Sequence, residues 1–216
     1  YADIGFSSPP HIFDDNDCKK ILEVVLLNNP ILKEIYTFRL AIDENERNKK
    51  QREKLFQCID FISTQKRQLI EEIPEFETYY KDWGEKTTLL FQDYNRRLRE
   101  QNAIDYDDIL LYAHRILLRP SIANIYRRTY HYILIDEAQD LNFAQYNIIK
   151  TICGDNHKNV LMVGDPKQAI YGFNGSSPVY MQNHFVEDFE AEKKVINFNY
   201  RSSKAVLSLA EKIQPN

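Results

Sequence analysis

The stretch that decides the fold reads ILIDEAQD, at residues 133–140. Residues 132–135 form a continuous apolar run, as in strands of parallel sheets that are buried on both faces. Asp136 and Glu137 follow this run at once. Ligands bind at the carboxyl ends of parallel strands, and successive side chains of an extended segment point to opposite sides. The two acids are therefore predicted to have different roles, one facing a magnesium ion and the other an attacking water. The alternative is a pair of acids that ends a strand in a solvated turn.

The segments around this stretch predict the fold class. A second apolar run lies at residues 160–163, and residues 142–152 between the two runs have helical spacing, with Gly154 as a C-cap. Residues 195–198 are predicted to form another strand, and residues 203–213 a helix. Alternating strands and helices with continuously apolar strands indicate an α/β domain with a parallel sheet.

A second group of candidate residues follows the second strand, in VLMVGDPKQAIYGFNG at residues 160–175. Asp165 is predicted to cap a short helical turn that begins with proline. Gln168 carries an amide that can donate and accept, so it can contact both a phosphate oxygen and a water. Tyr171 and Phe173 lie on a glycine-flanked loop, where aromatic rings suit stacking on bases. The alternative, that both rings belong to the core, is disfavoured by the neighbouring glycines.

A third group is NFNYRSS at residues 197–203. Tyr200 offers a flat face for a nucleobase, and the guanidinium of Arg201 matches the geometry of a phosphate. The alternative is a strand end followed by a helix that Ser202 or Ser203 caps.

The first part of the chain lacks this alternation of strands and helices. Residues 14–100 are predicted to be helical, and their polar run at 43–54 is interpreted as a solvated helix face or a flexible connection. Asp105 is predicted to cap a helix over residues 106–118, with Asp108 in its first turn. Apolar stripes at helical spacing comprise Leu55, Ile59 and Ile62, then Leu90, Tyr94 and Leu98, and a further stripe that crosses Pro74, where two helices are predicted to meet.

Composition narrows the class of protein. The 216 residues are 43% hydrophobic and 28% charged, which suits a folded protein with a core. Three cysteines without a C-x-x-C pattern disfavour a disulfide scaffold or zinc site and suit a reducing compartment, so we expect a cytoplasmic protein without a membrane segment. Because the net charge is −4, a nucleic-acid site must be a local patch or a stacking surface. The arginines at 96, 97, 99, 127 and 128 are interpreted as solvated rather than as contacts to duplex phosphates.

DEAQD, GDPKQAIYGFNGS and NYRSS, in this order, resemble motifs II, III and IV of the UvrD/Rep family of superfamily 1 DNA helicases. IDYDDIL at residues 104–110 is similar to the segment where that family's chain re-enters its first motor domain. The resemblance implies part of a RecA-like P-loop NTPase domain plus an all-helical insertion subdomain. Residues 1–103 would be the insertion, and residues 104–216 the C-terminal half of the first RecA-like motor domain. Relatives of this family move 3′ to 5′ on single-stranded DNA using ATP.

The resemblance also implies a nucleotide site that uses ATP and Mg²⁺. By the family pattern, Asp136 would hold Mg²⁺ and Glu137 would activate the hydrolytic water. Gln168 would couple the γ-phosphate to the DNA site. Tyr200 would stack on adenine, and Arg201 would contact the γ-phosphate.

For DNA, the resemblance implies that Tyr171 and Phe173 face a single strand, near duplex junctions, in repair or recombination. Many relatives have tryptophan at the position of Phe173 and arginine at that of Asn174, so this loop departs from the pattern and loses an expected phosphate contact.

No G-x-x-x-x-G-K-[ST] phosphate loop occurs in the 216 residues, and the sequence at 84–87, GEKT, does not fit one. Since the first residue is Tyr1, we expect an internal piece of a complete helicase that does not hydrolyse ATP alone. Two alternatives stay open: a non-catalytic DNA- or partner-binding module derived from a helicase, and another P-loop nucleotidase such as a repair ATPase without unwinding activity. The joint presence of QAIY and NYRSS argues against the second.

Overall fold

The structure, a computed structural model, describes residues 1–37, 43–71, 86–154 and 159–213. Its contacts group into two compact units. The first unit comprises residues 1–130 and 142–154, and the second comprises the described part of residues 131–141 and 155–216. The helix break predicted at Pro74 and the GEKT sequence from Gly84 fall at least partly outside the described residues. The division predicted between residues 103 and 104 stays a prediction.

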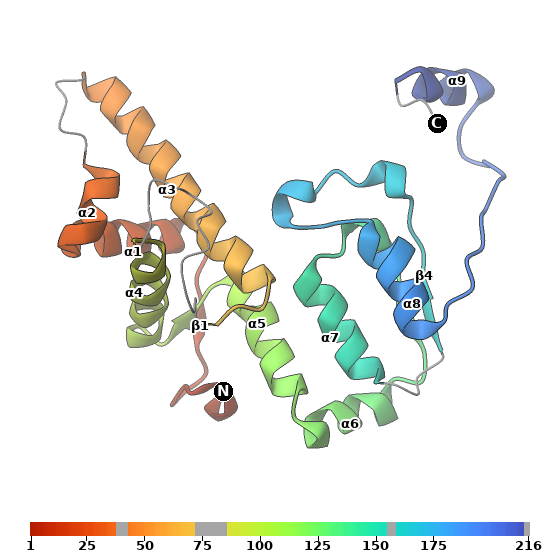
Figure 1. The fold of residues 1–216 in the computed structure, drawn as a ribbon, viewed down its shortest axis with the longest axis horizontal. Helices are drawn as coiled ribbons and strands as arrows, with labels where there is room; N and C mark the ends of the chain where they lie inside the picture. The colour runs from red at the N-terminus through yellow and green to blue at the C-terminus, as the bar shows by residue number, and fades with distance from the viewer. Residues whose placement is uncertain (38–42, 72–85, 155–158, 214–216) are drawn as a thin grey trace. The chain divides into compact units, whose positions relative to one another are not determined.

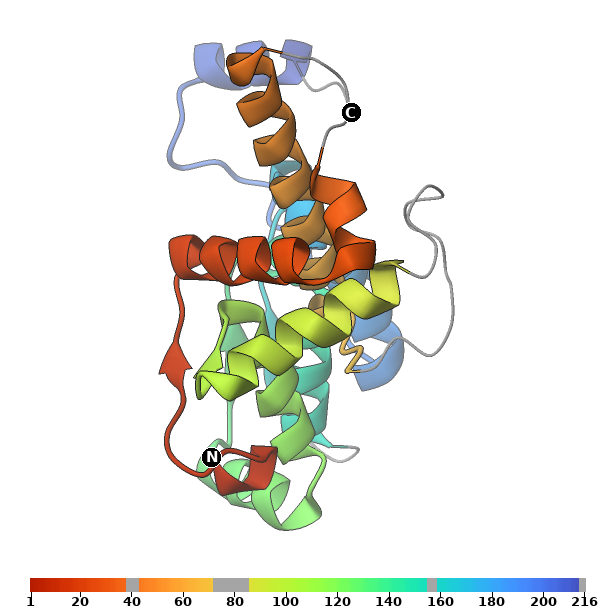
Figure 2. The same ribbon diagram turned by 90° about the vertical axis from the view of Figure 1, so that its left-hand side faces the viewer.

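Helices dominate the first unit, and Figures 1 and 2 show α1 lying against α4 and α3. Acidic or amide side chains cap the starts of three of these helices. Asp14 accepts from two backbone N–H groups at the start of α1, and Asn29 does the same for α2. Asp43 accepts from the N–H of Glu46 and caps α3. The bounds are α1 Asp15–Asn28, α2 Pro30–Tyr36, α3 Glu44–Arg67 and α4 Lys86–Glu100.

The core of these helices follows the predicted stripes. Leu55 and Ile62 of α3 are buried, and Ile59 packs against the same cluster. The stripe on α4 is buried throughout and consists of Leu90, Tyr94 and Leu98. The polar run at residues 43–54 forms the N-terminal half of α3 and lies mostly in solvent, which confirms the solvated-face interpretation. All three cysteines are free and buried.

A small parallel sheet marks where the chain enters and leaves these helices. Strand β1 (His11–Ile12) pairs with β2 (Ala103–Ile104), with Ile12 opposite Ile104. Residues 13–102 therefore leave and return at neighbouring points of the backbone. After β2, Asp105 caps α5 (Tyr106–Leu117) as predicted, and the structure adds that Asp108 in the first turn completes a reciprocal capping box.

Buried charges join α3 to the start of α5. Lys66 Nζ lies 2.6 Å from Asp105 Oδ2 and 2.7 Å from Asp108 Oδ1, and the lysine is 0% exposed. The Tyr94 hydroxyl donates to Asp105 Oδ2 at 3.1 Å. Burial alone would lower the pKa of Lys66, but the two carboxylates raise it above its ordinary value. Burial raises the pKa of Asp108 to about 6, although Lys66 opposes this.

Two further helices complete the first unit. They are α6 (Pro120–Thr129) and α7 (Phe143–Cys153), and both contact α5. Asn142 caps α7 through a capping box, and Gly154, at φ 63°, ends it, so both predicted ends are confirmed. Arg127 donates to the carbonyls of Thr151 and Ile152, which corrects its interpretation as a solvated residue.

The second unit is built on a parallel pair of strands. Strands β3 (Ile133–Ile135) and β4 (Val160–Met162) pair in register, which confirms the parallel arrangement predicted for an α/β fold. Short helical turns and two helices complete this unit, the first turn between the two strands and the others after β4. They are η2 (Ala138–Asp140), η3 (Pro166–Gln168), η4 (Gly172–Asn174), the π-helical η5 (Tyr180–His184), α8 (Phe185–Phe189) and α9 (Lys204–Ile213).

Two expectations for this unit are wrong. Residues 195–198 form no strand, because within the described residues no neighbouring strand supplies hydrogen bonds for them, and Ile196 is 84% exposed. Strands β3 and β4 are not buried on both faces: Leu134 is 73% exposed and Leu161 is 53% exposed, since no other described element covers these side chains.

No helix in the described ranges is long and apolar enough to cross a membrane.

Candidate nucleotide site

The ends of β3 and β4 bring two of the predicted motifs together. Because the strands are parallel and in register, their carboxyl ends lie side by side. The Val163 N–H donates to the Ile135 carbonyl at 2.8 Å, and the Ala138 N–H donates to the Val163 carbonyl at 2.9 Å. These bonds fix the DEAQD turn against the segment that begins GDPKQ.

Asp136 and Glu137 lie exposed at this edge. The strand ends at Ile135, and Glu137 adopts a left-handed backbone conformation with φ 51° and ψ 39°. Its N–H donates to Asp136 Oδ1 at 2.9 Å. The extended geometry predicted for this pair is therefore wrong, because a tight turn begins directly after the strand. The separate roles of the two carboxylates stay a prediction.

Gln139, which the sequence reasoning did not single out, is the buried centre of the turn. It is 1% exposed, donates from Nε2 to Glu137 Oε2 at 2.7 Å and accepts at Oε1 from the Asp165 N–H at 3.0 Å. A signal was present: a neutral amide lies inside a motif that otherwise presents acids, and a buried amide needs partners for both ends.

Asp165 and Gln168 are joined after β4. Asp165 caps η3 by accepting from the Lys167 N–H at 3.0 Å at Oδ1, which confirms the predicted cap. Its Oδ2 accepts from Gln168 Nε2, also at 3.0 Å. Gln168 is exposed beyond this bond.

Tyr171 and Phe173 face solvent, so the alternative that they are core residues is wrong. They are 44% and 71% exposed, and their ring centroids lie 5.9 Å apart at an interplanar angle of 59°. Gly175, at φ 75°, ends the turn η4 in the left-handed region that favours glycine. The loop thus presents two neighbouring rings for a planar ligand.

Tyr200 and Arg201 are not brought to the strand-end site. Tyr200 is 91% exposed, and its ring contact is with Phe198 at 6.4 Å. The backbone N–H of Arg201 donates to Asn199 Oδ1 at 2.9 Å. Ser203 accepts from the Val206 N–H at 3.5 Å, a long bond near the start of α9.

The carboxylates at this edge suit a metal that is only partly bound by protein. No group of three or more His, Cys, Asp or Glu side chains within the described residues could hold a metal ion. Magnesium commonly takes one or two carboxylates and completes its shell with waters and substrate phosphates. A single exposed carboxylate such as that of Asp136 fits this pattern.

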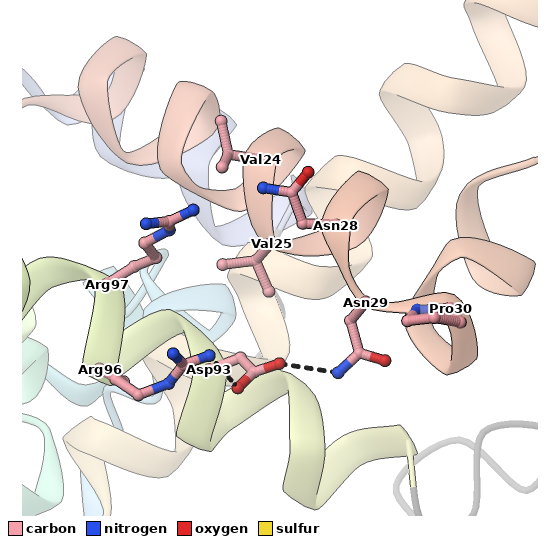
Figure 3. A pocket seen from close by; sticks show the side chains of 8 residues that line it. All are labelled: Val24, Val25, Asn28, Asn29, Pro30, Asp93, Arg96 and Arg97. Carbon is pink, nitrogen blue, oxygen red and sulfur yellow. Dashed lines mark hydrogen bonds and ion pairs between the residues drawn. The ribbon is translucent and has the colours of Figure 1, made fainter.

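A pocket of about 370 Å³ in the first unit lies between α1 and α4, and no residue of these motifs lines it (Figure 3). Its charged side chains are paired. Asp93 accepts hydrogen bonds from Asn29 at 2.8 Å and from Arg96 at 2.7 Å, and Arg97 donates a hydrogen bond to Glu100 at 3.1 Å. These ion pairs favour the interpretation of this arginine cluster as a solvated face. The pocket is lined by Val24, Val25, Asn28, Asn29, Pro30, Asp93, Arg96 and Arg97.

Comparison with known proteins gives one family and several relatives. Residues 1–190 match the family described as UvrD/REP helicase N-terminal domain. The chain is 30% identical over 217 residues to the ATP-dependent DNA helicase PcrA of Staphylococcus aureus (strain NCTC 8325 / PS 47), covering 99% of this chain and 27% of PcrA. It is 35% identical over 147 residues to the ATP-dependent DNA helicase UvrD1 of Mycobacterium leprae, covering 61% of this chain and 18% of UvrD1. The chain thus spans about a quarter or less of the length of these relatives.

Proposed function

The chain belongs to the UvrD/REP helicase family, and we propose that it is the part of an ATP-dependent DNA helicase that completes the nucleotide site of the first motor domain. The whole enzyme moves 3′ to 5′ on single-stranded DNA and acts at duplex junctions in repair or recombination, in the cytoplasm. The relatives whose names give an activity are ATP-dependent DNA helicases, which supports this proposal.

One observation carries the proposal: the turn after β3 is hydrogen-bonded to the end of β4, at the carboxyl edge of a parallel pair. Ligands of α/β sheets bind at this edge. An acidic pair and the Asp165–Gln168 pair therefore meet where a RecA-like domain would bind a nucleotide.

The pairing of β1 with β2 supports the proposed domain division. An inserted subdomain must leave and re-enter its host at neighbouring points, and Ile12 lies opposite Ile104. We assign residues 1–103 to a helical insertion subdomain together with the short segment, residues 1–12, that leads into it, and residues 104–216 to the C-terminal half of the first RecA-like motor domain.

The chemistry follows from the residues at the edge. When bound, Mg²⁺ supplies charge neutralisation for the phosphates of ATP, and Asp136 would hold it. Glu137 accepts a proton from the attacking water. Gln168 contacts the γ-phosphate, since its amide lies exposed and is anchored at one end by Asp165. Tyr200 stacks on adenine and Arg201 contacts the γ-phosphate, which requires the segment that carries them to approach the edge.

Tyr171 and Phe173 are assigned to single-stranded DNA. Their rings are solvent-exposed on a short turn, and stacking on an aromatic ring does not depend on base identity. The negative net charge is compatible with this mode of binding, because stacking does not require a basic surface.

Paired substitutions test the nucleotide site in the full-length protein. We expect Asp136→Asn to weaken Mg²⁺-dependent nucleotide binding. Glu137→Gln should leave nucleotide affinity nearly unchanged and slow single-turnover hydrolysis by about 10²–10⁴-fold, the usual contribution of a general base. The amide is close in size to the carboxylate, so folding is retained. The assignment fails if Glu137→Gln lowers affinity as much as Asp136→Asn, or if its hydrolysis rate equals that of the wild type.

A further inference from the structure

We propose that Gln139 and Asp165 form a hydrogen-bonded relay that positions Glu137 and Gln168 relative to each other. This inference rests on the proposed function, because it concerns the residues assigned to water activation and to the γ-phosphate. Gln139 and Asp165 are positioning residues in it, and they act through their neighbours.

The first half of the relay is the amide of Gln139. Its Nε2 donates to Glu137 Oε2 at 2.7 Å, and its Oε1 accepts from the Asp165 N–H at 3.0 Å. The orientation of the amide is fixed by its partners, since an ionised carboxylate only accepts and a backbone N–H only donates. A side chain with only acceptors or with no polar atoms cannot serve both partners.

The second half is the carboxylate of Asp165. Its Oδ1 accepts from the Lys167 N–H, and its Oδ2 accepts from Gln168 Nε2, both at 3.0 Å. Asp165 therefore donates to Gln139 from its backbone N–H and accepts from Gln168 at its side-chain carboxylate. The hydrogen bonds run from Glu137 through Gln139 and Asp165 to Gln168.

The packing around Gln139 gives independent support. The side chain is 1% exposed, so an unpaired end of its amide would be costly. Gly164 lies directly against it: a Cβ at this position would collide with Gln139 Oε1 and come within 2.9 Å of Met181 Sδ and 3.0 Å of the Ala138 nitrogen. The absence of a side chain at residue 164 is therefore what leaves room for the relay.

Methionine at position 139 removes both hydrogen bonds at similar side-chain length. In the full-length protein with single-stranded DNA, we expect Gln139→Met to slow single-turnover ATP hydrolysis at least about tenfold, the loss expected for a hydrogen bond to a charged group. The Kd of a non-hydrolysable ATP analogue should change less than about twofold, because Gln139 itself does not contact the nucleotide and the bond from Gln168 to Asp165 remains.

A matched control is Gln65→Met on α3, which replaces another buried glutamine, 5% exposed, in the first unit. It should leave the hydrolysis rate unchanged. Gln139→Glu is nearly isosteric and decides the question if Gln139→Met does not fold: it keeps an acceptor for the Asp165 N–H and places a carboxylate against Glu137, so it should also slow hydrolysis.

A double-mutant cycle separates positioning from a general structural role. If Gln139 acts through Glu137, Gln139→Met has no further effect in a Glu137→Gln background. An equal loss in both backgrounds overturns the relay, as does a wild-type rate in folded Gln139→Met or Gln139→Glu. A wild-type protein that hydrolyses no ATP refutes the proposed function itself, whereas hydrolysis that depends on Glu137 but not on Gln139 refutes only the relay.

Discussion

Replacing Lys66 by methionine tests whether a buried cation fastens α3 to the first turn of α5. Lys66 is 0% exposed and lies 2.6 Å and 2.7 Å from carboxylate oxygens of Asp105 and Asp108. Methionine matches the length of the aliphatic chain, so the substitution removes the charge and its hydrogen bonds while leaving most of the packing.

The free energy that Lys66→Met is expected to cost depends on the partners that Asp105 and Asp108 keep. Removing one partner of a buried ion pair costs about 3–5 kcal/mol, because the other charge stays buried and uncompensated. Asp105 keeps the bonds from the Tyr94 hydroxyl at 3.1 Å and from the Asp108 N–H at 2.8 Å. Asp108 has a pKa that burial already raises to about 6, so it takes up a proton readily once Lys66 is gone. Both effects place the cost near the lower end, at about 3 kcal/mol.

Hydrogen exchange on the full-length protein measures this locally, without requiring that the whole chain unfold in one step. A loss of about 3 kcal/mol raises the local opening constant about 100-fold, so amides in the first turns of α5 should exchange that much faster. The control is Lys50→Met on the same helix. Lys50 lies 2.8 Å from Glu46 Oε1, but the two side chains are 41% and 48% exposed, so the expected change is below about 1 kcal/mol.

Unchanged exchange in α5 of a folded Lys66→Met protein would refute the reasoning, since it would mean that the buried charges contribute no net attachment. Slower exchange would refute it as well, because the two carboxylates would then be better accommodated without the cation. An equal effect of Lys50→Met would show that burial does not decide the magnitude.

Three further predictions concern other parts of the chain. Phe173→Ala should weaken binding of single-stranded DNA about 5–150-fold, which is the usual contribution of stacking on one base. Phe56→Ala, on α3 and equally exposed at 71%, should leave this binding unchanged. Equal effects of the two substitutions would show that the loop is not a DNA contact. Because burial raises the pKa of Asp108 to about 6 from an ordinary 3.8, its contribution to stability is present below pH 4 and lost as pH rises through 6. Hydrogen exchange in α5 should therefore show the wild type losing stability relative to Asp108→Asn over this range, and the opposite trend would contradict the assignment. The 216-residue chain alone should show no steady-state ATPase activity, since it contains no phosphate-loop motif; activity that Glu137→Gln abolishes would disprove this.

Much of the local structure was predictable because its signals are local. Asp105 and Asn142 cap α5 and α7 as their side chains require, and Gly154 ends α7 in a conformation with positive φ. The parallel pairing of β3 and β4 followed from two apolar runs separated by a helix. The exposure of Tyr171 and Phe173 followed from the glycines beside them, which cannot build a packed helix face.

The wrong predictions concern segments whose structure depends on a neighbouring element of the fold. Residues 195–198 have the composition of a strand, but a strand exists only beside another backbone that accepts its hydrogen bonds. Leu134 and Leu161 were expected in a core, yet apolar composition does not say which element covers a side chain. The backbone of Glu137 turns left-handed because the chain after β3 must close onto Val163, a constraint absent from the local sequence.

The sequence by itself determined the order of β3, α7 and β4, the caps Asp105 and Asp165 and the family, since periodicity, capping residues and motifs are properties of short segments. Only the tertiary structure decided which distant residues became partners. It placed the amide of Gln139 between Glu137 and Asp165, and it enclosed Lys66 between two carboxylates 39 and 42 positions further along the chain. The physical reason is that a buried polar group must find its partners in space, and the three-dimensional path of the chain decides which of them lie within hydrogen-bonding distance.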